Sequence, residues 1–368
     1  MKKGWQTRNL GDLCRIRTGK KDVNEGNPEG AFPFFTCAAE HTFSDNYSFD
    51  TEALLIAGNG DVGKVSYYNG KFEAYQRTYV LSDFAEVSPR FLYLILDGKL
   101  KDTVSKQKLG NTMPYIKVGM LTDFQLPVPP LAEQQRIVGL LDEAFEGLAT
   151  AKANAEKNLQ NARALFESHL RSVFTQRGPG WVEKSLGDVC ETTQGVQIPK
   201  NLHFKSPGEN RRRYLYISDF DHDENLKYVD DIFPKKRVTE NDLIVVNTGA
   251  TAGKIFRGID GVLSNNLFKV TLNQAIDGDF LYYIVTSSLF KEHQKKIVKG
   301  TANPHMGHEN FKSTPANIPP LDVQLETVTK LDELAEETQR LARLYERKLA
   351  ALEALKKSLL HQAFTGAL

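Results

Sequence analysis

The chain has 368 residues, which is enough for two globular domains and too many for one ordinary core. Hydrophobic residues at 40% and charged residues at 25% are typical of a folding chain and exclude a disordered or fibrous one. The formal net charge of +1 lacks the basic excess usual in proteins that wrap phosphates, although acidic surface elsewhere can offset a local basic face.

The first part of the chain is predicted to form a globule of short β-rich segments. Strand-like stretches at 54–57 and 65–68 are bounded by glycine and asparagine, and helical spacing follows at 89–96. Prolines between 127 and 130 then end the last extended segment, because proline cannot continue a ladder and favours the first turn of a following helix. We expect a mixed α/β globule over residues 1–130.

A long helix is predicted from Leu131 to about Thr175, a stretch without proline in which only Gly139 and Gly147 interrupt. Apolar residues from Val138 onward follow alternating spacings of three and four, which is an a/d seam. Such a helix is roughly 65 Å long at about 1.5 Å per residue and needs a partner. The core stripe of an ordinary helical bundle is the alternative interpretation. We assign residues 131–177 to a spacer helix.

The same order of elements returns in the second half. Strand-like stretches at 243–247 and 267–272 and helical spacing at 279–286 indicate a second globule over residues 178–320. A second long helix without proline is predicted from Leu321 to about Thr365, within a spacer of residues 321–368. Lys152 in the first seam and Lys356 in the second are the charged interruptions of otherwise apolar stripes.

The two halves also match residue by residue, so the chain is a tandem repeat. Trp5 and the run Leu10-Gly11-Asp12 recur 176 residues later, and after an insertion the offset becomes 189 to 190. The matched pairs include Gly19 with Gly195, Gly63 with Gly253, Tyr93 with Tyr282, Leu131 with Leu321, Asp142 with Asp332 and Phe174 with Phe364. We therefore predict an α+β fold of two tandem α/β domains joined by two long helices that form an antiparallel coiled coil with pseudo-twofold symmetry.

Neither a membrane nor an oxidising compartment is indicated. About 18 consecutive apolar residues occur nowhere, and Met1–Leu13 lacks the apolar core of a signal peptide. Cys14, Cys37 and Cys190 are an odd, sparse set without CxxC spacing, so we expect neither a disulfide framework nor a zinc site. We predict a cytoplasmic protein.

Three motifs imitate chemical sites, and we reject each. The segment 58–64 has the spacing of a phosphate-binding loop, but Val65 stands where serine or threonine should hold magnesium. The acidic segment 219–230 resembles a calcium loop with Glu224 at the glycine position. His305 and His308 have metal-like spacing without a companion ligand, and we interpret them as loop residues. We predict no catalytic residue and no metal site.

The run that begins with Pro129-Pro130-Leu131 and continues Ala-Glu-Gln-Gln-Arg-Ile-Val resembles the specificity subunits of Type I restriction-modification systems. The Trp…Leu-Gly-Asp opening, the Gly63-Lys64 turn and the segment Gly110-Asn-Thr112 add to this resemblance, which covers essentially the whole chain. The second copy departs from the pattern at Asp322-Val-Gln324-Leu-Glu326, where the Glu-Gln-Gln-Arg run is missing.

The resemblance implies a division of labour among subunits. Each globule would be a target recognition domain that reads one half of a bipartite, asymmetric site in double-stranded DNA. The helices would set the gap and dock two modification (methyltransferase) subunits, which bind S-adenosylmethionine. Restriction subunits with translocase activity, which use ATP and magnesium, would join them. The chain itself would bind no cofactor and would not be an enzyme.

Paired basic stretches suggest where DNA lies. Lysines of 99–117 surround a polar, glycine-containing segment, and lysines of 291–299 surround an equivalent one, although a single such run is usually a solvated helix face. Arginine suits guanine, and asparagine or glutamine suits adenine, but both residue types are also common in turns. The candidate DNA-binding residues are Lys20, Lys21, Gln76, Arg77, Lys106, Lys108, Asn111, Thr112, Lys200, Arg211, Arg212, Arg213, Asn265, Asn266, Lys295, Lys296, Lys299, Thr301 and Asn303.

Two other functions are weighed against this one. A protein-binding scaffold, with two interaction domains on a coiled-coil spacer and no nucleic acid, is favoured by the near-neutral charge. An independent enzyme that uses the segment 58–64 is the third possibility. Salt-sensitive binding to duplex DNA would distinguish the DNA-binding function from the protein-binding scaffold.

Overall fold

The computed structural model of the chain describes residues 4–107, 115–297 and 305–368. Strands before the first long helix are β1 (Gln6–Asn9), β2 (Arg15–Thr18), β3 (Phe32–Phe35), β4 (Thr42–Ser44), β5 (Phe49–Ala57), β6 (Val65–Ala74), β7 (Thr78–Ser82) and β8 (Gln125–Val128). Later strands are β9 (Val182–Ser185), β10 (Cys190–Gln194), β11 (Arg211–Leu215), β12 (Tyr228–Asp230), β13 (Arg237–Val238), β14 (Leu243–Val246), β15 (Ile255–Arg257), β16 (Gly261–Leu263), β17 (Leu267–Leu272) and β18 (Pro315–Ile318). The helices are α1 (Pro89–Gln107), α2 (Val118–Thr122), α3 (Leu131–Thr175), α4 (Gly278–Thr286), α5 (Ser288–Ile297), α6 (His308–Lys312) and α7 (Leu321–Thr365).

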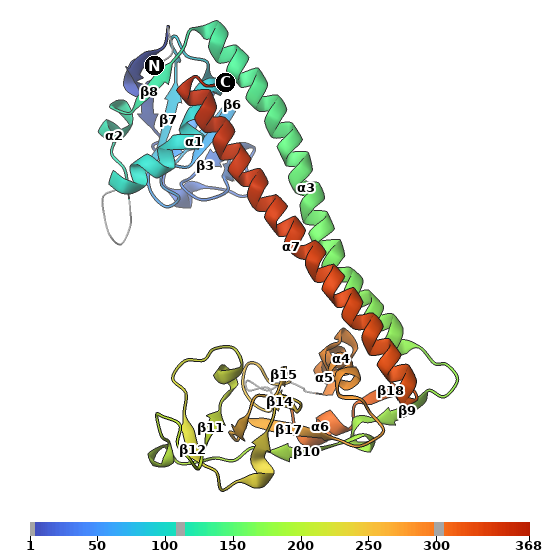
Figure 1. Ribbon diagram of the computed structural model, residues 1–368. Coiled ribbons are helices and arrows are strands. Elements are labelled where there is room, and N and C mark those ends of the chain that lie inside the picture. Colours follow the sequence, from blue (N-terminus) through green and yellow to red (C-terminus); the bar gives the residue numbers. More distant parts are fainter. Residues whose placement is uncertain (1–3, 108–114, 298–304) are drawn as a thin grey trace. The chain divides into compact units, whose positions relative to one another are not determined.

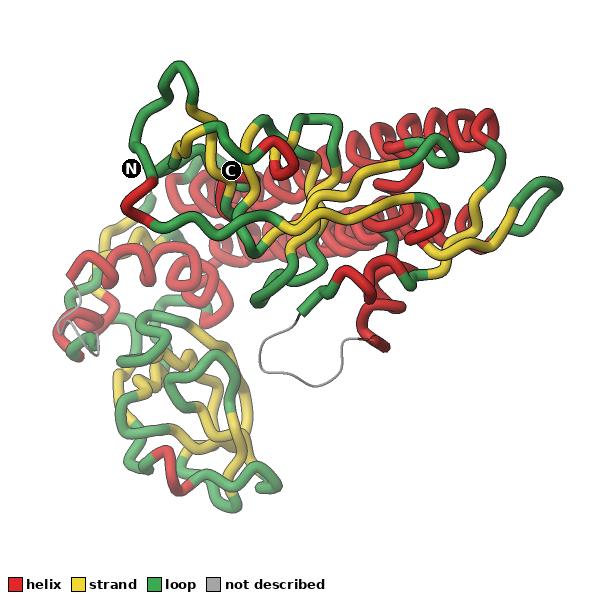
Figure 2. The backbone as a smooth tube through the Cα atoms, turned by 90° about the horizontal axis from the view of Figure 1, so that it is seen from below, coloured by secondary structure: helices red, strands yellow, loops and turns green. Residues whose placement is uncertain are grey.

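The chain forms two compact units, and each combines a globule with stretches of both long helices (Figure 1). Unit 1 contains Met1–Glu156 and Glu346–Leu368, and unit 2 contains Lys157–Tyr345. Each globule is built mainly of strands and loops with short helices (Figure 2). The mixed architecture with two tandem domains confirms the predicted fold class, whereas the limits at residues 130, 177 and 320 stay predictions for separate domains.

Unit 1 is organised by a six-stranded sheet in the order β2-β7-β5-β6-β3-β4. Its pairings are antiparallel except that of β3 with β6, which is parallel. The central strands β5 and β7 are buried along most of their length, as expected for the apolar run that ends at Ala57. A separate ribbon of β1 and β8 joins the start of the globule to the residues that precede α3.

Unit 2 repeats this plan with two four-stranded sheets, in the orders β10-β17-β14-β15 and β12-β11-β16-β13. The parallel pair β11–β16 corresponds to β3–β6, and the ribbon β9–β18 corresponds to β1–β8. The stretch between Gly195 and Ile244, which includes the inserted residues, holds β11, β12 and β13, so the second globule differs most from the first where its sequence is longer.

Close backbone contacts explain why one glycine recurs in both repeats. A Cβ atom on Gly19 would lie 1.8 Å from the carbonyl oxygen of Ala74, and one on Gly195 would lie 2.0 Å from that of Ser264. Both glycines directly follow the first strand of the main sheet, β2 or β10. Any other residue would push these two segments apart.

Helices α3 and α7 are 45 residues long, and their limits confirm the predicted ones. They run antiparallel in unit 1, where Lys152 pairs with Glu353 at 2.8 Å and Lys356 lies 5.3 Å from the ring centroid of Phe145. Ile137 and Phe364 join the core of that globule. In unit 2, Leu170 and Leu331 do the same from the other ends of the helices.

Within the described residues, no helix is both long and apolar enough to cross a membrane. The long helices are exposed and charged along their outer faces, and each buries only a narrow stripe. Their pseudo-twofold relation stays a prediction.

Candidate nucleic-acid interface

The predicted base-reading pairs occupy one and the same turn in the two repeats. Gln76–Arg77 connect β6 to β7, and Asn265–Asn266 connect β16 to β17. The Arg77 carbonyl accepts a hydrogen bond of 3.0 Å from the amide of Gly58, and the Asn266 carbonyl accepts one of 2.8 Å from Asn247. All four turn residues are exposed. The scaffold is therefore duplicated while the side chains it presents differ.

In unit 1 the structure brings Lys20 and Lys21 next to this turn. The Gln76 amide donates to the carbonyl of Lys21 at 2.9 Å, and its side chain donates to Asp22 Oδ2 at 3.2 Å. Lys21 Nζ pairs with Glu25 at 2.6 Å, which raises the pKa of Lys21 and lowers that of Glu25. Lys20 is exposed beside them. Four predicted residues from two distant segments thus form one polar edge.

In unit 2 the turn borders a basic groove, formed by Lys200, His203, Lys205, Tyr216, Ile217, Ser218, Lys227 and Asn266. No carboxylate lines it. Among the described residues, the lysines at 200, 205 and 227 have no ion-pair partner. His203 and Tyr216 add aromatic surface, with their ring centroids 6.4 Å apart. Unpaired cations, aromatic rings and an exposed amide side chain are the groups that contact nucleic acid.

The arginine run predicted from the insertion lies mostly in internal ion pairs. Arg212 contacts Asp231 at 2.7 Å and Asp260 at 2.9 Å, and Arg213 contacts Asp219 at 3.2 Å. Arg211 lies with its guanidinium 3.3 Å from the ring centroid of Phe204. These contacts stabilise the sheet β12-β11-β16-β13 internally, and a phosphate would have to compete with aspartate for the same guanidinium groups.

A partly buried polar cluster, made of Thr192, Gln194, Asn247 and His308, supports the Asn265–Asn266 turn. His308 contacts Thr192 Oγ1 through Nδ1 and Gln194 Oε1 through Nε2, both at 2.6 Å. Gln194 also accepts from Asn247 Nδ2 at 3.1 Å and donates to the backbone carbonyl of Asn265. The cluster therefore holds the backbone of the turn in place through Gln194.

The acid–base state of His308 follows from these contacts. Burial, and after it the nearby charge of Lys312, lowers the pKa of His308. The neutral ring with a proton on Nε2 donates to Gln194 Oε1 and accepts from the Thr192 hydroxyl, so it satisfies both partners. The interpretation of His308 as a loop residue is corrected: it begins helix α6 and packs 4.6 Å from the ring of Phe268.

The remaining predicted residues divide into two groups. Lys295 and Lys296 are exposed on α5, and this helix is separated in the sequence from the Asn265–Asn266 turn. The side chain of Lys106 and the whole of Lys108, Asn111, Thr112, Lys299, Thr301 and Asn303 lie outside the described residues. All of these, like the other candidate DNA contacts, stay predictions.

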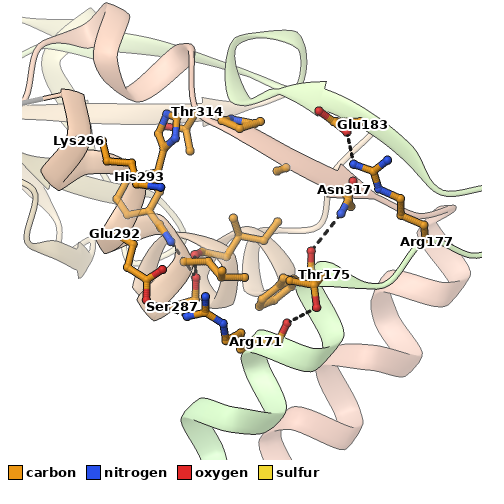
Figure 3. A pocket seen from close by; sticks show the side chains of 16 residues that line it. Arg171, Thr175, Arg177, Glu183, Ser287, Glu292, His293, Lys296, Thr314 and Asn317 are labelled. Atoms are coloured by element: carbon orange, nitrogen blue, oxygen red, sulfur yellow. Dashed lines mark hydrogen bonds and ion pairs between the residues drawn. The ribbon is translucent and has the colours of Figure 1, made fainter.

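Lys296 borders a second pocket of unit 2, of about 430 Å³, between the end of α3, helix α5 and strands β9 and β18 (Figure 3). Its arginines are already paired, Arg171 with Glu292 at 2.7 Å and Arg177 with Glu183 at 2.7 Å. The Asn317 side chain donates to the carbonyl of Phe174 at 3.1 Å. These contacts attach the helix end to the globule and leave little positive charge for a ligand.

The segments rejected as chemical sites are turns with internal partners. Lys101 pairs with Asp61 at 2.6 Å, and Lys64 donates to the carbonyl of Ala39. In the acidic segment, Asp221 pairs with Lys254 at 3.0 Å and Asp223 with Arg213 at 2.8 Å. Over residues 4–107, 115–297 and 305–368, no group of three or more histidines, cysteines or carboxylates is arranged to hold a metal ion.

Sequence reasoning missed Gln194, His203, Tyr216 and Lys227. Lys227 stands in a stretch dominated by carboxylates, which hides its position at a basic groove. The polar cluster gives no repeat signal either, because unit 1 carries Val118 at the position of His308. Only the pairing of distant strands brings these residues together.

Comparison with known proteins gives a consistent result. A family model described as the Type I restriction modification DNA specificity domain matches residues 2–159 and again 179–347. The EcoDI Type I restriction enzyme specificity subunit of Escherichia coli is 27% identical, with 99% of this chain and 88% of that protein covered. The MjaVIII specificity subunit of Methanocaldococcus jannaschii is 22% identical, with 98% and 92% covered.

Solved structures share the fold. A chain from a study of complex assembly and conformational transition in the type I R-M system has a TM-score of 0.79 at 18% identity, with 100% of this chain and 99% of that one covered. The HsdS subunit from Thermoanaerobacter tengcongensis has a TM-score of 0.64 at 18% identity, with 100% and 98% covered. At these identities the likeness concerns the fold alone.

Proposed function

Because this chain belongs to the family of Type I restriction-modification DNA specificity subunits, we propose that each of its globules reads one half of a bipartite, asymmetric site in double-stranded DNA. The supporting observation is the duplicated turn, which presents Gln76–Arg77 in one unit and Asn265–Asn266 in the other. One scaffold with two different pairs of side chains is what reading two different half-sites requires.

The chemistry of each pair suggests what it reads. Arg77 can donate two hydrogen bonds to guanine O6 and N7, and Gln76 suits adenine N6 and N7 in the major groove. Asn265 and Asn266 favour adenine on the same grounds. In unit 2 the lysines of the basic groove hold the phosphate backbone and so set the register of the duplex.

The long helices supply the second part of the proposed function. They set the gap between the half-sites and dock two modification subunits, which bring S-adenosylmethionine and methylate adenine. Restriction subunits that use ATP and magnesium complete the complex in the cytoplasm. In this scheme the chain binds no cofactor and supplies no reacting group, and its contribution is to place the methyltransferases on one sequence.

Methylome sequencing of a host that carries this chain with its modification subunit tests the proposal. We expect one methylated motif, split into two specific halves by a gap of fixed length. Replacing Asn265 and Asn266 by alanine should relax one half only, and replacing Gln76 and Arg77 should relax the other. A continuous motif, or relaxation of both halves by one pair, would contradict the assignment.

A further inference from the structure

A cavity of about 430 Å³ lies in unit 1 between the loop after β3 and the strands β5 and β6. Aromatic rings form its walls, with centroids 5.1 Å apart for Phe35 and His41 and 5.4 Å apart for His41 and Phe43. Its size falls in the range of about 300–1,000 Å³ that small-molecule sites occupy. None of the residues predicted to contact DNA lines it.

The repeat shows what fits at this place. Ser66 on β6 pairs with Leu55 on β5, and the matching pair in unit 2 is Phe256 on β15 with Ile244 on β14. There, Phe220 from the loop after β11 stacks on Phe256 with centroids 4.6 Å apart and planes at 19°. Unit 2 thus fills the space with two parallel aromatic rings, whereas serine leaves the corresponding space of unit 1 open.

The polar groups around the cavity differ in the same way. In unit 2, Lys254 pairs with Asp221 at 3.0 Å beside the stacked rings. Its counterpart Lys64 contacts only the carbonyl of Ala39, and within the described parts of the chain it has no carboxylate partner. The Ser66 hydroxyl and the His41 imidazole likewise have no hydrogen-bond partner among the described residues. The cavity therefore offers aromatic walls, hydrogen-bonding groups and one cation without an ion-pair partner among the described residues, and the carboxylate of Glu40 also lines it.

We propose that this cavity binds a nucleobase. A flat heteroaromatic ring would take the place that Phe220 occupies in unit 2 and stack against Phe35 and His41, with its polar edge toward Ser66. Lys64 would contact the attached phosphate. The base comes either from the bound duplex, unstacked from the half-site that unit 1 reads, or from a free nucleoside or nucleotide. The first source rests on the proposed function.

The test uses Ser66→Phe, which copies the residue that unit 2 carries at this position, with Ser66→Ala as the matched control. The first measurement is the binding of the full chain, with its modification subunit, to duplexes carrying one mismatch at each position of the mapped half-sites. A mismatch removes part of the cost of unstacking, so we expect about tenfold tighter binding at one position of the unit 1 half-site. Ser66→Ala should keep this effect and Ser66→Phe should abolish it.

The second measurement titrates the full chain with free nucleosides and nucleoside monophosphates by ligand-detected NMR. Binding to the wild type and Ser66→Ala, but not to Ser66→Phe, identifies a free ligand as the source. A wild type with neither mismatch preference nor nucleoside binding overturns the proposal, as does a Ser66→Phe variant that retains them. If Ser66→Phe does not fold by circular dichroism, Ser66→Val fills part of the cavity and should weaken both signals.

Failure of the proposed function looks different in these assays. It would appear as a wild-type complex that does not prefer the mapped site over random duplex at any salt concentration. The nucleoside titration needs no DNA, so in that case it still tests whether the cavity binds a nucleobase. Retained preference for the mapped site, with no role for Ser66, would refute the cavity proposal alone.

Discussion

Two buried glutamines explain the Pro-Pro-Leu-x-x-Gln sequence at the start of each long helix. The side chain of Gln134 donates to the carbonyls of Pro129 at 2.8 Å and Glu86 at 3.1 Å, and it accepts from the amide of Ser88 at 2.7 Å. Gln324 makes the same three contacts with Pro319, Ala275 and Asp277. Both side chains are 0% exposed. Each joins a helix start to the loop that precedes α1 or α4.

Gln134→Ala should therefore destabilise unit 1 by about 3 kcal/mol, because one amide and two carbonyls lose their partner in a buried place. Urea unfolding of the full chain gives the change, and hydrogen exchange at the amide of Ser88 locates it. The control is Gln135→Ala, an exposed neighbour on the same helix, which should cost less than about 0.5 kcal/mol. Unchanged exchange at Ser88 in Gln134→Ala would refute the structural role.

His308 makes the stability of unit 2 depend on pH. Its pKa is lowered by burial from the ordinary value near 6.5, so the unfolded chain binds a proton more readily than the folded one. The stability contributed by the neutral ring is complete above about pH 6.5 and is lost as the pH falls through the lowered pKa. Lys312, Glu309, His305 and Lys236 are the other titratable groups that act on it.

We expect His308→Gln to flatten the pH dependence of the melting temperature between about pH 7 and pH 5, because glutamine cannot take up the proton. The matched control is His222→Gln, at an exposed histidine of the same unit, which should leave the wild-type slope in place. An equal slope in His308→Gln and the wild type would show that other groups cause the acid sensitivity.

The role of a single residue could be predicted from the sequence where both repeats carry the same residue. It could not be predicted where only one repeat carries it. Gly19 and Gly195 recur because each meets a carbonyl oxygen at the same strand crossing. His308 has no counterpart, and its partners Gln194 and Asn247 are far from it in sequence. Likewise, no local pattern distinguishes a lysine in a groove from an arginine that aspartates already hold.

At the scale of elements, the antiparallel contact of α3 and α7 in unit 1 rests partly on the pair Lys152–Glu353. The side-chain hydrogen bond between the two residues raises the pKa of Lys152 and lowers that of Glu353. Lys152 breaks the apolar seam, and an exposed partner on the other helix compensates for that interruption.

Reversing one charge should destabilise this contact, and reversing both should restore it. We expect Lys152→Glu and Glu353→Lys each to lower the melting temperature of unit 1, and the double variant to recover most of the loss. Raising the salt concentration should shrink all three effects, since the pair is exposed. If the double variant melts at the sum of the two single losses, the residues do not interact in solution.

Helices were easier to predict than sheets for a physical reason. The limits of α3 and α7 follow from prolines and from the periodicity of contiguous residues. The sheets depend on pairings between segments far apart, such as β2 with β7 or β11 with β16, and an alternating pattern does not specify a partner. The insertion in unit 2 could be located in the sequence, but the division of its strands into two separate sheets could not be predicted.

For the whole molecule, the placement of the charges reconciles the near-zero net charge with DNA binding. Aspartates at 219, 223, 231 and 260 neutralise the arginines of the insertion, and Glu292 neutralises Arg171. The basic groove of unit 2 holds lysines without such partners among the described residues. A chain of charge +1 can therefore present a positively charged face, as DNA binding requires.

The salt dependence of DNA binding measures that face directly. Each neutralised phosphate contributes about 0.9 to the slope of log K against log salt, so replacing Lys200, Lys205 and Lys227 by alanine should reduce the slope by about 2.7. Because these contacts hold the backbone, the affinities for specific and random duplex should fall together. The control variant, Lys330→Ala with Arg340→Ala, removes two charges that Glu326 and Glu337 already pair and should leave the slope unchanged. An unchanged slope in the triple variant, measured by fluorescence anisotropy, would remove the groove from the interface, since phosphate contacts and counterion release cannot be separated.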